Sequence, residues 1–408
     1  MSSSAARRSR DGMVALTATL AIQMFTSLAA TAPAVLAPAL AQDLGITGVW
    51  IGIFVGLIYA GAMVSSLASG GFITRYGAIR VSQVCVLLCA IGIALVALLP
   101  ATAVGLLAGS ALLLGLGYGP ITPASSQVLA RTTPPARMSL VFSIKQTGVP
   151  AGTALAGAVL PGFALIAGWR GALLFVAVLG LVVAAVAQAP RASLDSDRSP
   201  ATQFNVAALL APLRTVARSR PLRELAFLAF AYASVQVCLT TFLVLYLHEV
   251  LNWSLIKAGL ALTAATLGGV VGRIFWGAIA DRGSPPRRVL TIIGLIAGIC
   301  GALLALASPT WEIWLLLSVV ALFGATAIGW NGVHLAELAR EAPPGTAGAI
   351  TGAAGFVTFA GVVMGPPLFA LLAGITASYR IAFVTFAGVS LIAAGVLSQR
   401  RERATSQP

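Results

Sequence analysis

The segment Leu129-Ala-Arg-Thr-Thr-Pro-Pro135 is repeated 209 residues later as Leu338-Ala-Arg-Glu-Ala-Pro-Pro344. Each copy follows an apolar, glycine-rich stretch that is long enough to cross a lipid bilayer as a helix. A second pair of segments, Gly70–Gly77 and Gly277–Ser284, is related by an offset of 207 residues. Two matches at nearly the same offset indicate two similar halves of the parallel repeat type.

The composition is typical of a membrane protein. Of the 408 residues, 59% are hydrophobic and 9% are charged, whereas soluble proteins carry about 25% charged residues. Disordered chains are excluded as well, because they have low hydrophobicity. The apolar stretches predict twelve transmembrane helices near residues 13–40, 49–73, 81–99, 103–123, 139–160, 169–188, 225–247, 258–280, 289–307, 313–336, 346–373 and 381–398.

We therefore predict an all-α membrane protein with twelve transmembrane helices in two six-helix pseudo-symmetric bundles. The expected parts are an N-terminal half over residues 1–189, a cytoplasmic linker with a short surface helix over 190–223, and a C-terminal half over 224–408. The arginine-rich N-terminus resembles a signal peptide, but the apolar run from Met13 to Leu40 is too long for one. An uncleaved first helix is expected instead.

The net charge of +14 predicts the orientation of the chain in the membrane. With the N-terminus in the cytoplasm, twenty of the 25 basic residues fall in cytoplasmic segments, three in outer segments and two within spans. This asymmetry predicts a multi-pass protein of the cytoplasmic (inner) membrane with both termini cytoplasmic. The expected partner of these charges is the lipid bilayer rather than nucleic acid.

The sequence carries no pattern typical of an enzyme. It has no P-loop, no Cys/His metal cluster and no Ser/His/Asp arrangement at a common depth. All four cysteines lie in apolar stretches, which favours buried hydrophobic residues over disulfides or metal ligands. We expect no catalysis, no cofactor and no metal, and we expect a monomer.

The loop Gly277-Ala-Ile-Ala-Asp281-Arg282 and its degenerate twin after the second span resemble the loop pattern of the major facilitator superfamily. The resemblance covers essentially the whole chain, and it implies that Asp281, Arg282, Arg75 and Gly77 latch helix ends and gate the cytoplasmic side. A carboxylate stabilises the positive end of a helix dipole, so Thr74, in the place of the first acid, implies a weaker latch there. The usual arginine of the fourth span is missing, with Ala111 near that position.

Two basic residues, Lys145 and Arg273, lie inside predicted spans. A charged side chain within a membrane span costs at least about 2.5–3.5 kcal/mol of free energy. We therefore treat both residues as candidates for function. Each lies eight residues from a cytoplasmic span end, at Arg137 and Asp281, which is a depth of about 12 Å. No Asp or Glu lies well inside a span, so two cations facing one cavity favour a small organic anion. Snorkelling of Lys145 and pairing of Arg273 with helix carbonyls remain open alternatives.

The stretch Gly272-Arg-Ile-Phe-Trp-Gly277 resembles the eighth span of the oxalate/formate antiporters and the monocarboxylate transporters. In that branch the matching arginine binds the substrate carboxylate, which implies this role for Arg273. Those antiporters place a lysine in the eleventh span. Here Lys145, in the fifth span, is the only candidate counterpart. This departure from the antiporter pattern leaves open whether oxalate is the substrate.

Uncharged polar residues in the spans are further candidates for substrate contact. Asn331 lies at a depth similar to that of the two cations, and His334 shares its helix face. Hydrogen bonding between helices is the alternative for these side chains. The candidates for substrate binding, beside Arg273 and Lys145, are Asn331, Tyr59, Gln236, Gln23, Tyr118 and His334.

These observations predict a secondary active transporter that moves a small organic anion, a mono- or dicarboxylate, by alternating access. An arginine fork matches a carboxylate in a bidentate manner, and a lysine adds a compact second charge. Burial favours the neutral amine of a lysine, and an entering anion restores its charge, so proton coupling and anion exchange (symport or antiport) both remain open. The alternative function is an exporter of drugs or neutral metabolites with the same fold.

Overall fold

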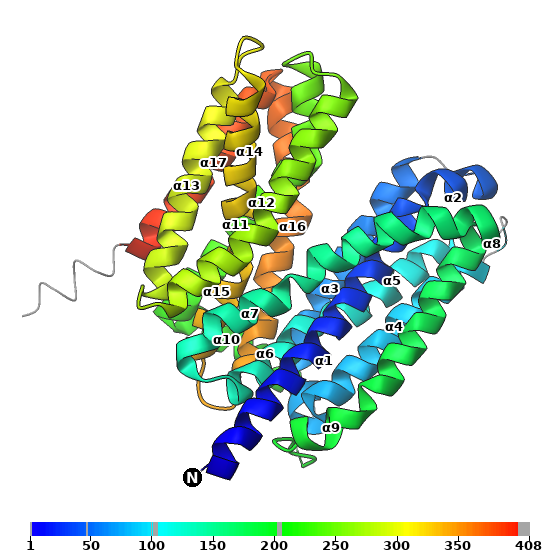
Figure 1. Ribbon diagram of the computed structural model, residues 1–408, viewed down its shortest axis with the longest axis vertical. Helices are drawn as coiled ribbons and strands as arrows, with labels where there is room; N and C mark the ends of the chain where they lie inside the picture. The colour runs from blue at the N-terminus through cyan, green and yellow to red at the C-terminus, as the bar shows by residue number, and fades with distance from the viewer. Residues whose placement is uncertain (1, 46–47, 99, 101–104, 202–205, 399–408) are drawn as a thin grey trace, which may run out of the picture. The chain divides into compact units, whose positions relative to one another are not determined.

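The computed structural model describes residues 2–45, 48–98, 100, 105–201 and 206–398. The longer regular elements in these ranges are α-helices (Figure 1). In chain order they are α1 (Ser2–Val35), α2 (Ala37–Leu44), α3 (Gly48–Tyr76), α4 (Ala78–Leu98), α5 (Leu106–Tyr118), α6 (Ile121–Thr132), α7 (Met138–Gln146), α8 (Gly148–Val186), α9 (Gln188–Leu194), α10 (Val206–Arg218), α11 (Arg220–Glu249), α12 (Leu255–Asp281), α13 (Pro286–Leu306), α14 (Ile313–Ala327), α15 (Asn331–Glu341), α16 (Ala347–Thr376) and α17 (Tyr379–Ser398).

Eleven helical stretches in the described ranges are long and apolar enough to cross a membrane. One of them, Pro135–Val186, has 52 residues, which is about 78 Å of helix against a hydrocarbon core of about 30 Å. The helix is broken at Gly168, where φ is 70° and ψ is 168°, and α8 turns back there (Figure 1). Gly168 thus separates the predicted fifth and sixth spans, which confirms the twelve-helix fold.

Several predicted spans differ in detail from the observed helices. The first span ends at Val35, two residues after Pro33, and α2 follows as a separate short helix. The fourth and tenth spans, predicted as continuous, are each interrupted: α5 ends at Tyr118 and α14 ends at Ala327. The short surface helix predicted in the linker is expected at its apolar stretch, Phe204–Leu213. Phe204 lies outside the described residues, and α10 runs from Val206 to Arg218.

Contacts divide the chain into two compact units. The first comprises Met1–Pro134, Lys145–Ala217 and Ala342–Phe356, and the second comprises Pro135–Ile144, Arg218–Glu341 and Val357–Pro408. In the first unit α1 packs along α8, α3 along α5, and α4 on both α5 and α8. In the second, α13 packs along α17, α12 along α14, and α11 on α17 and α12.

Matched glycine contacts hold one helix pair in each unit. A Cβ atom at Gly115 would collide with the carbonyl oxygen of Ile58, and a Cβ atom at Gly324 would collide with that of Ala265. Likewise, a Cβ atom at Gly61 would lie 2.9 Å from the carbonyl oxygen of Leu112. Its counterpart at Gly268 would collide with the carbonyl oxygen of Ala321.

The members of these pairs are related by offsets of 207 residues on α3 and α12 and of 209 on α5 and α14. These are the offsets found between the repeated loop segments. The repeat therefore extends from the loops into the packing of the helices, where small residues allow two backbones to approach closely.

Candidate functional site

The ammonium group of Lys145 lies inside the first unit. Its side chain is 1% exposed, and Nζ donates hydrogen bonds to Oε1 of Gln23 at 2.7 Å and to Oε1 of Gln146 at 3.1 Å. Lys145 lies in the last turn of α7, and the approach of α8 to α1 brings it to Gln23. A Cβ atom at Gly148 would lie 3.1 Å from Cβ of Gln23, so a larger residue there would press on this contact.

Gln23 connects Lys145 to other polar side chains. Its Oε1 also accepts a hydrogen bond from Oγ1 of Thr122 at 3.4 Å. Its Nε2 donates to Oγ of Ser27, one turn further along α1, also at 3.4 Å. A continuous polar path therefore runs from Lys145 through Gln23 to Ser27.

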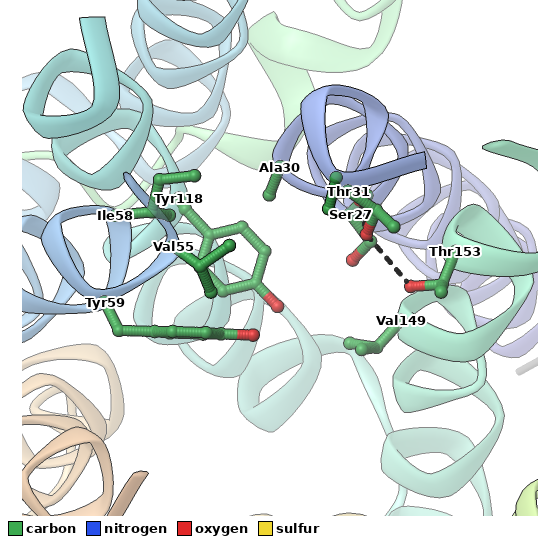
Figure 2. Close-up of a pocket in the computed structure, with 10 residues that line it drawn as sticks. Ser27, Ala30, Thr31, Val55, Ile58, Tyr59, Tyr118, Val149 and Thr153 are labelled. Atoms are coloured by element: carbon green, nitrogen blue, oxygen red, sulfur yellow. Dashed lines mark hydrogen bonds between the residues drawn. The ribbon is translucent and has the colours of Figure 1, made fainter. Parts of the chain in front are cut away.

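Ser27 lies in the wall of a cavity of about 190 Å³ that is formed by α1, α3, α5 and α8 (Figure 2). Tyr59 and Tyr118 enter it from one side, with ring centroids 6.4 Å apart and ring planes at 88°. Thr31 and Thr153 face them from the opposite side, and their hydroxyl oxygens are 3.3 Å apart. The remaining lining is aliphatic: Ala30, Ala34, Val55, Ile58 and Val149.

In the second unit, Arg273 lies against the interruption between α14 and α15. The side chain is 2% exposed, and Nε donates to the carbonyl oxygen of Ile328 at 3.1 Å. Asn331 Nδ2 reaches the same oxygen at 3.4 Å. The predicted alternative, pairing with a helix carbonyl, thus holds for Nε, which is one of the five N–H donors of a guanidinium.

Gln236 joins α11 to the start of α15. Its Oε1 accepts hydrogen bonds from Nε1 of Trp330 and Nδ2 of Asn331, each at 3.2 Å. His334 is 3.1 Å from the carbonyl oxygen of Leu225 through Nε2, and its ring packs edge-on against Trp330 with centroids 5.2 Å apart. His334 therefore makes a contact between helices, which was the alternative considered for it.

The predicted binding residues thus form two groups, and each group lies within one unit. The first unit holds Lys145, Gln23, Tyr59 and Tyr118; the second holds Arg273, Asn331, Gln236 and His334. A single site that uses both cations stays a prediction. Sequence reasoning missed Ser27, Thr31, Thr122 and Thr153. A signal for two of them exists, because Gln23, Ser27 and Thr31 recur every four residues and so share one face of a helix.

Among the predicted gating residues, Asp281 lies at the N-terminus of α7. Its carboxylate accepts hydrogen bonds from the backbone N–H groups of Ser139 at 3.0 Å and Leu140 at 2.7 Å. Such N–H groups have no partner inside the helix, and a carboxylate satisfies them. The arginine that reaches this carboxylate is Arg340, at 3.5 Å, and sequence reasoning had not singled it out.

In the first unit, Thr74 stands at the position of Asp281 and supplies no charge, and a carboxylate of the linker caps a different helix. Asp195 accepts hydrogen bonds from the N–H groups of Ile79 at 2.7 Å and Arg80 at 3.0 Å, at the start of α4. Burial raises the pKa of Asp195, while these two hydrogen bonds and Arg191 act to lower it. A carboxylate so far along the chain from the helix that it caps gives no local sequence signal.

Gly77, another predicted gating residue, leaves room for Asp195. Its φ is 93°, and a Cβ atom there would lie 2.6 Å from Cβ of Asp195. Ser199 N–H also donates to the carbonyl oxygen of Thr74 at 2.7 Å, which fixes the following part of the linker. Arg75 lies over the ring of Tyr76, with Cζ 5.5 Å from its centroid.

Comparisons with known proteins show which family and which relatives this chain resembles. The sequence profile described as Major Facilitator Superfamily matches residues 19–366. A gallate transporter of Pseudomonas putida is 28% identical over 321 residues, 71% of this chain and 69% of that protein. An uncharacterized MFS-type transporter of Mycobacterium tuberculosis is 27% identical over 269 residues, 66% of this chain and only 59% of the relative's own length.

Solved structures share the fold. The Escherichia coli fucose:proton symporter FucP superposes with a TM-score of 0.74 at 17% identity, covering 95% of this chain and 100% of that chain. The human organic anion transporter MFSD10 gives 0.72 at 19% identity, covering 96% and 99%. A bacterial homologue of the iron transporter ferroportin gives 0.74 at 15%, covering 95% and 100%.

Proposed function

Because the chain belongs to the Major Facilitator Superfamily, we propose that it is a secondary active transporter and that its cargo is a small organic anion, a mono- or dicarboxylate. It works by alternating access in the cytoplasmic membrane, with both termini in the cytoplasm. The excess of basic residues on one side of the predicted spans supports this orientation.

The observation that carries the proposal is the burial of two cations in the spans. Lys145 is 1% and Arg273 is 2% exposed, and the hydrogen bonds described above join them to amide and carbonyl oxygens. No Asp or Glu of the sequence lies in the middle of a span. Retaining two charges in so apolar a protein is costly, and an anionic cargo gives them a use.

We assign the carboxylate of the cargo to Arg273, whose planar fork matches a carboxylate, and a second attraction to Lys145. Asn331 and Gln236 orient the cargo, and Asp281 with Arg340 holds the start of α7 during gating. The relative named a gallate transporter supports an organic anion as cargo. In the same proposal, transport is coupled to protons or to exchange with a second anion.

The test replaces Arg273 by lysine, which keeps the charge and removes the fork. Uptake of carboxylates into vesicles that contain the Arg273→Lys protein should fall at least tenfold, because one point charge cannot reproduce a bidentate contact. Arg288 is exposed at the start of α13, so Arg288→Lys is the matched control and should transport normally. Near-normal uptake by a folded Arg273→Lys protein would show that Arg273 does not bind the carboxylate of the cargo.

A further inference from the structure

We propose that Gln127, oriented by Asp197 of the linker, is the latch that holds the start of α16 and that must open when the cytoplasmic side opens. It takes the place of the acid that the first half lacks at Thr74. The inference rests on the proposed function, because a latch matters only in a chain that alternates between two states. The residues of this latch all lie in the first unit.

The repeat relates the start of α16 to the start of α7. Ser139, the second residue of α7, has its counterpart 209 residues later in Gly348, the second residue of α16. In the second unit, the N–H group of Ser139 donates to the carboxylate of Asp281. The counterpart of Asp281, at an offset of 207 residues, is Thr74, which has no carboxylate to offer to Gly348.

The side chain of Gln127, on α6, accepts this hydrogen bond instead. The N–H group of Gly348 donates to Oε1 of Gln127 at 2.9 Å. A Cβ atom at Gly348 would lie 3.0 Å from Cβ of Gln127, so the two helices are in close contact there. Nε2 of Gln127 donates to the carbonyl oxygen of Gly345, just before α16, at 3.1 Å. One amide group thus holds both the first turn of α16 and the residues that lead into it.

Asp197 of the linker fixes the direction of this amide group. Its Oδ2 accepts a hydrogen bond from Nε2 of Gln127 at 3.0 Å. A carboxylate only accepts hydrogen bonds, so Nε2 faces Asp197 and Oε1 is left to face α16.

The repeated arginines support the same assignment. Arg131 pairs with Asp197, with 3.3 Å between Nη1 and Oδ1. Its counterpart at the offset of 209 residues is Arg340, which reaches Asp281 in the second unit. Each arginine therefore binds the acid of its own latch, directly capping the helix in the second unit and acting through Gln127 in the first.

The position of α16 in the chain explains why this latch has to open. The helix packs in the first unit up to Phe356 and in the second unit beyond it. The linker and the segment that precedes α16 are both predicted to be cytoplasmic. If the two halves rock to open this side, the start of α16 has to leave α6, and the hydrogen bond to Gln127 has to break.

Hydrogen exchange of the full-length protein, measured by mass spectrometry, tests the latch. Gln127→Leu should raise exchange at the start of α16 about fivefold, because the loss of one hydrogen bond shifts a local opening equilibrium by about this factor. Asp197→Ala should raise it by a smaller factor, because the amide group loses its fixed direction. Exchange at the start of α7, which Asp281 holds, should stay unchanged. Arg198→Ala is the matched linker control, since Arg198 is exposed, and it should change neither helix start.

A rescue variant separates the latch from general damage. Thr74→Asp, added to Gln127→Leu, supplies an acid at the position that Asp281 has in the second half. Exchange at the start of α16 should then return to within about twofold of the wild type. Absence of rescue would show that Gln127 does not take the place of that acid. Increased exchange at both helix starts in Gln127→Leu would show that this residue supports the whole fold, and it would also overturn the proposal.

Uptake of labelled lactate, succinate and benzoate into vesicles separates this inference from the proposed function. A weaker latch lowers the fraction of protein that is open to the outside, so the KM for entry from that side should rise in both latch variants, by at most about fivefold. An unchanged KM beside raised exchange would show that the latch has no part in gating. If the wild type takes up none of the three anions, the proposed function fails, whereas exchange still shows whether Gln127 holds α16. If uptake is measured but exchange at α16 is unchanged in both variants, the latch is wrong and the proposed function stands.

Discussion

At the scale of single residues, Lys145 combines a full charge with an almost completely buried side chain. The oxygen atoms of Gln23 and Gln146 that accept its hydrogen bonds carry only partial charges. Removing an ammonium group from water costs several kcal/mol, and neutral dipoles recover only part of it. Residues that serve function often lower stability in this way.

Replacing this residue should separate stability from function. In Lys145→Met, the side chain is one atom shorter, stays unbranched and loses its charge, while Gln23 keeps its hydrogen bond from Thr122. The free energy of unfolding should stay within about 1 kcal/mol of the wild type or rise, and carboxylate uptake should be lost. Thermal unfolding and vesicle uptake measure the two effects. A loss of several kcal/mol would instead identify Lys145 as a structural residue.

A second prediction concerns the contact of Gly77 with Asp195. Gly77→Ala adds strain at positive φ and a clash with the carboxylate side chain, and it should destabilise the protein by about 2–3 kcal/mol. Gly283 has a φ of 99° but no atom within 4 Å of an added Cβ. Gly283→Ala therefore reports strain alone and should cost about 1 kcal/mol. If thermal unfolding showed the same loss of stability for Gly77→Ala and Gly283→Ala, the position of Asp195 would not depend on Gly77.

Some of the site residues could be predicted from the sequence, and others could not. Gln23, Tyr59 and Tyr118 could be identified as candidates because a polar side chain in an apolar span stands out. Asp195 could not, because it caps a helix that begins more than 100 residues earlier in the chain. Asp281 could be singled out from its loop pattern, whereas its partner Arg340 lies on a different helix and could not.

At the scale of elements, the interruptions of the fourth and tenth spans show what local patterns omit. The first interruption has a local signal in Gly119 and Pro120. The second has no proline, and the carbonyl oxygen of Ile328 is held by Arg273 and Asn331 instead. A hydrogen bond from another helix leaves no trace in hydrophobic periodicity, so the sequence predicted a continuous span.

The pairing of α3 with α5 gives the prediction at this scale. Gly115→Ala would push a methyl group into the carbonyl oxygen of Ile58, and it should destabilise the protein by about 1–3 kcal/mol because the two backbones must separate. Gly109 lies in the same helix with no atom within 4 Å of an added Cβ. Gly109→Ala should therefore be neutral or stabilising, since alanine is the better helix former. Thermal unfolding of the two variants should differ clearly, and equal stability would exclude a tight contact.

At the scale of the whole molecule, composition and repeat were sufficient to predict a twelve-helix membrane protein in two similar halves. These properties depend on many residues at once, so local errors do not remove them. The division between the fifth and sixth spans was also predicted, and Gly168 explains it. The interruption at Ile328 and the contacts of the linker depend on single long-range hydrogen bonds, and they could not be predicted from the sequence.

The orientation of the molecule can be tested with single cysteines. Lys257, in a predicted outer segment, and Arg288, in a predicted cytoplasmic one, are both exposed, while the four native cysteines are buried. In intact cells, a membrane-impermeant maleimide should label Lys257→Cys and leave Arg288→Cys unlabelled. Permeabilised cells should show both labelled. The opposite pattern in intact cells would reverse the topology.

The matched glycine contacts also carry information about history. Copying of one ancestral six-helix segment accounts for glycines that recur at offsets of 207 and 209 and press on equivalent carbonyl groups. The buried cations do not recur: the same offsets carry Lys145 to Ala354 and Arg273 to Ser66. The packing is thus common to both halves. The charges are particular to each half, so that one repeated frame holds two different chemistries.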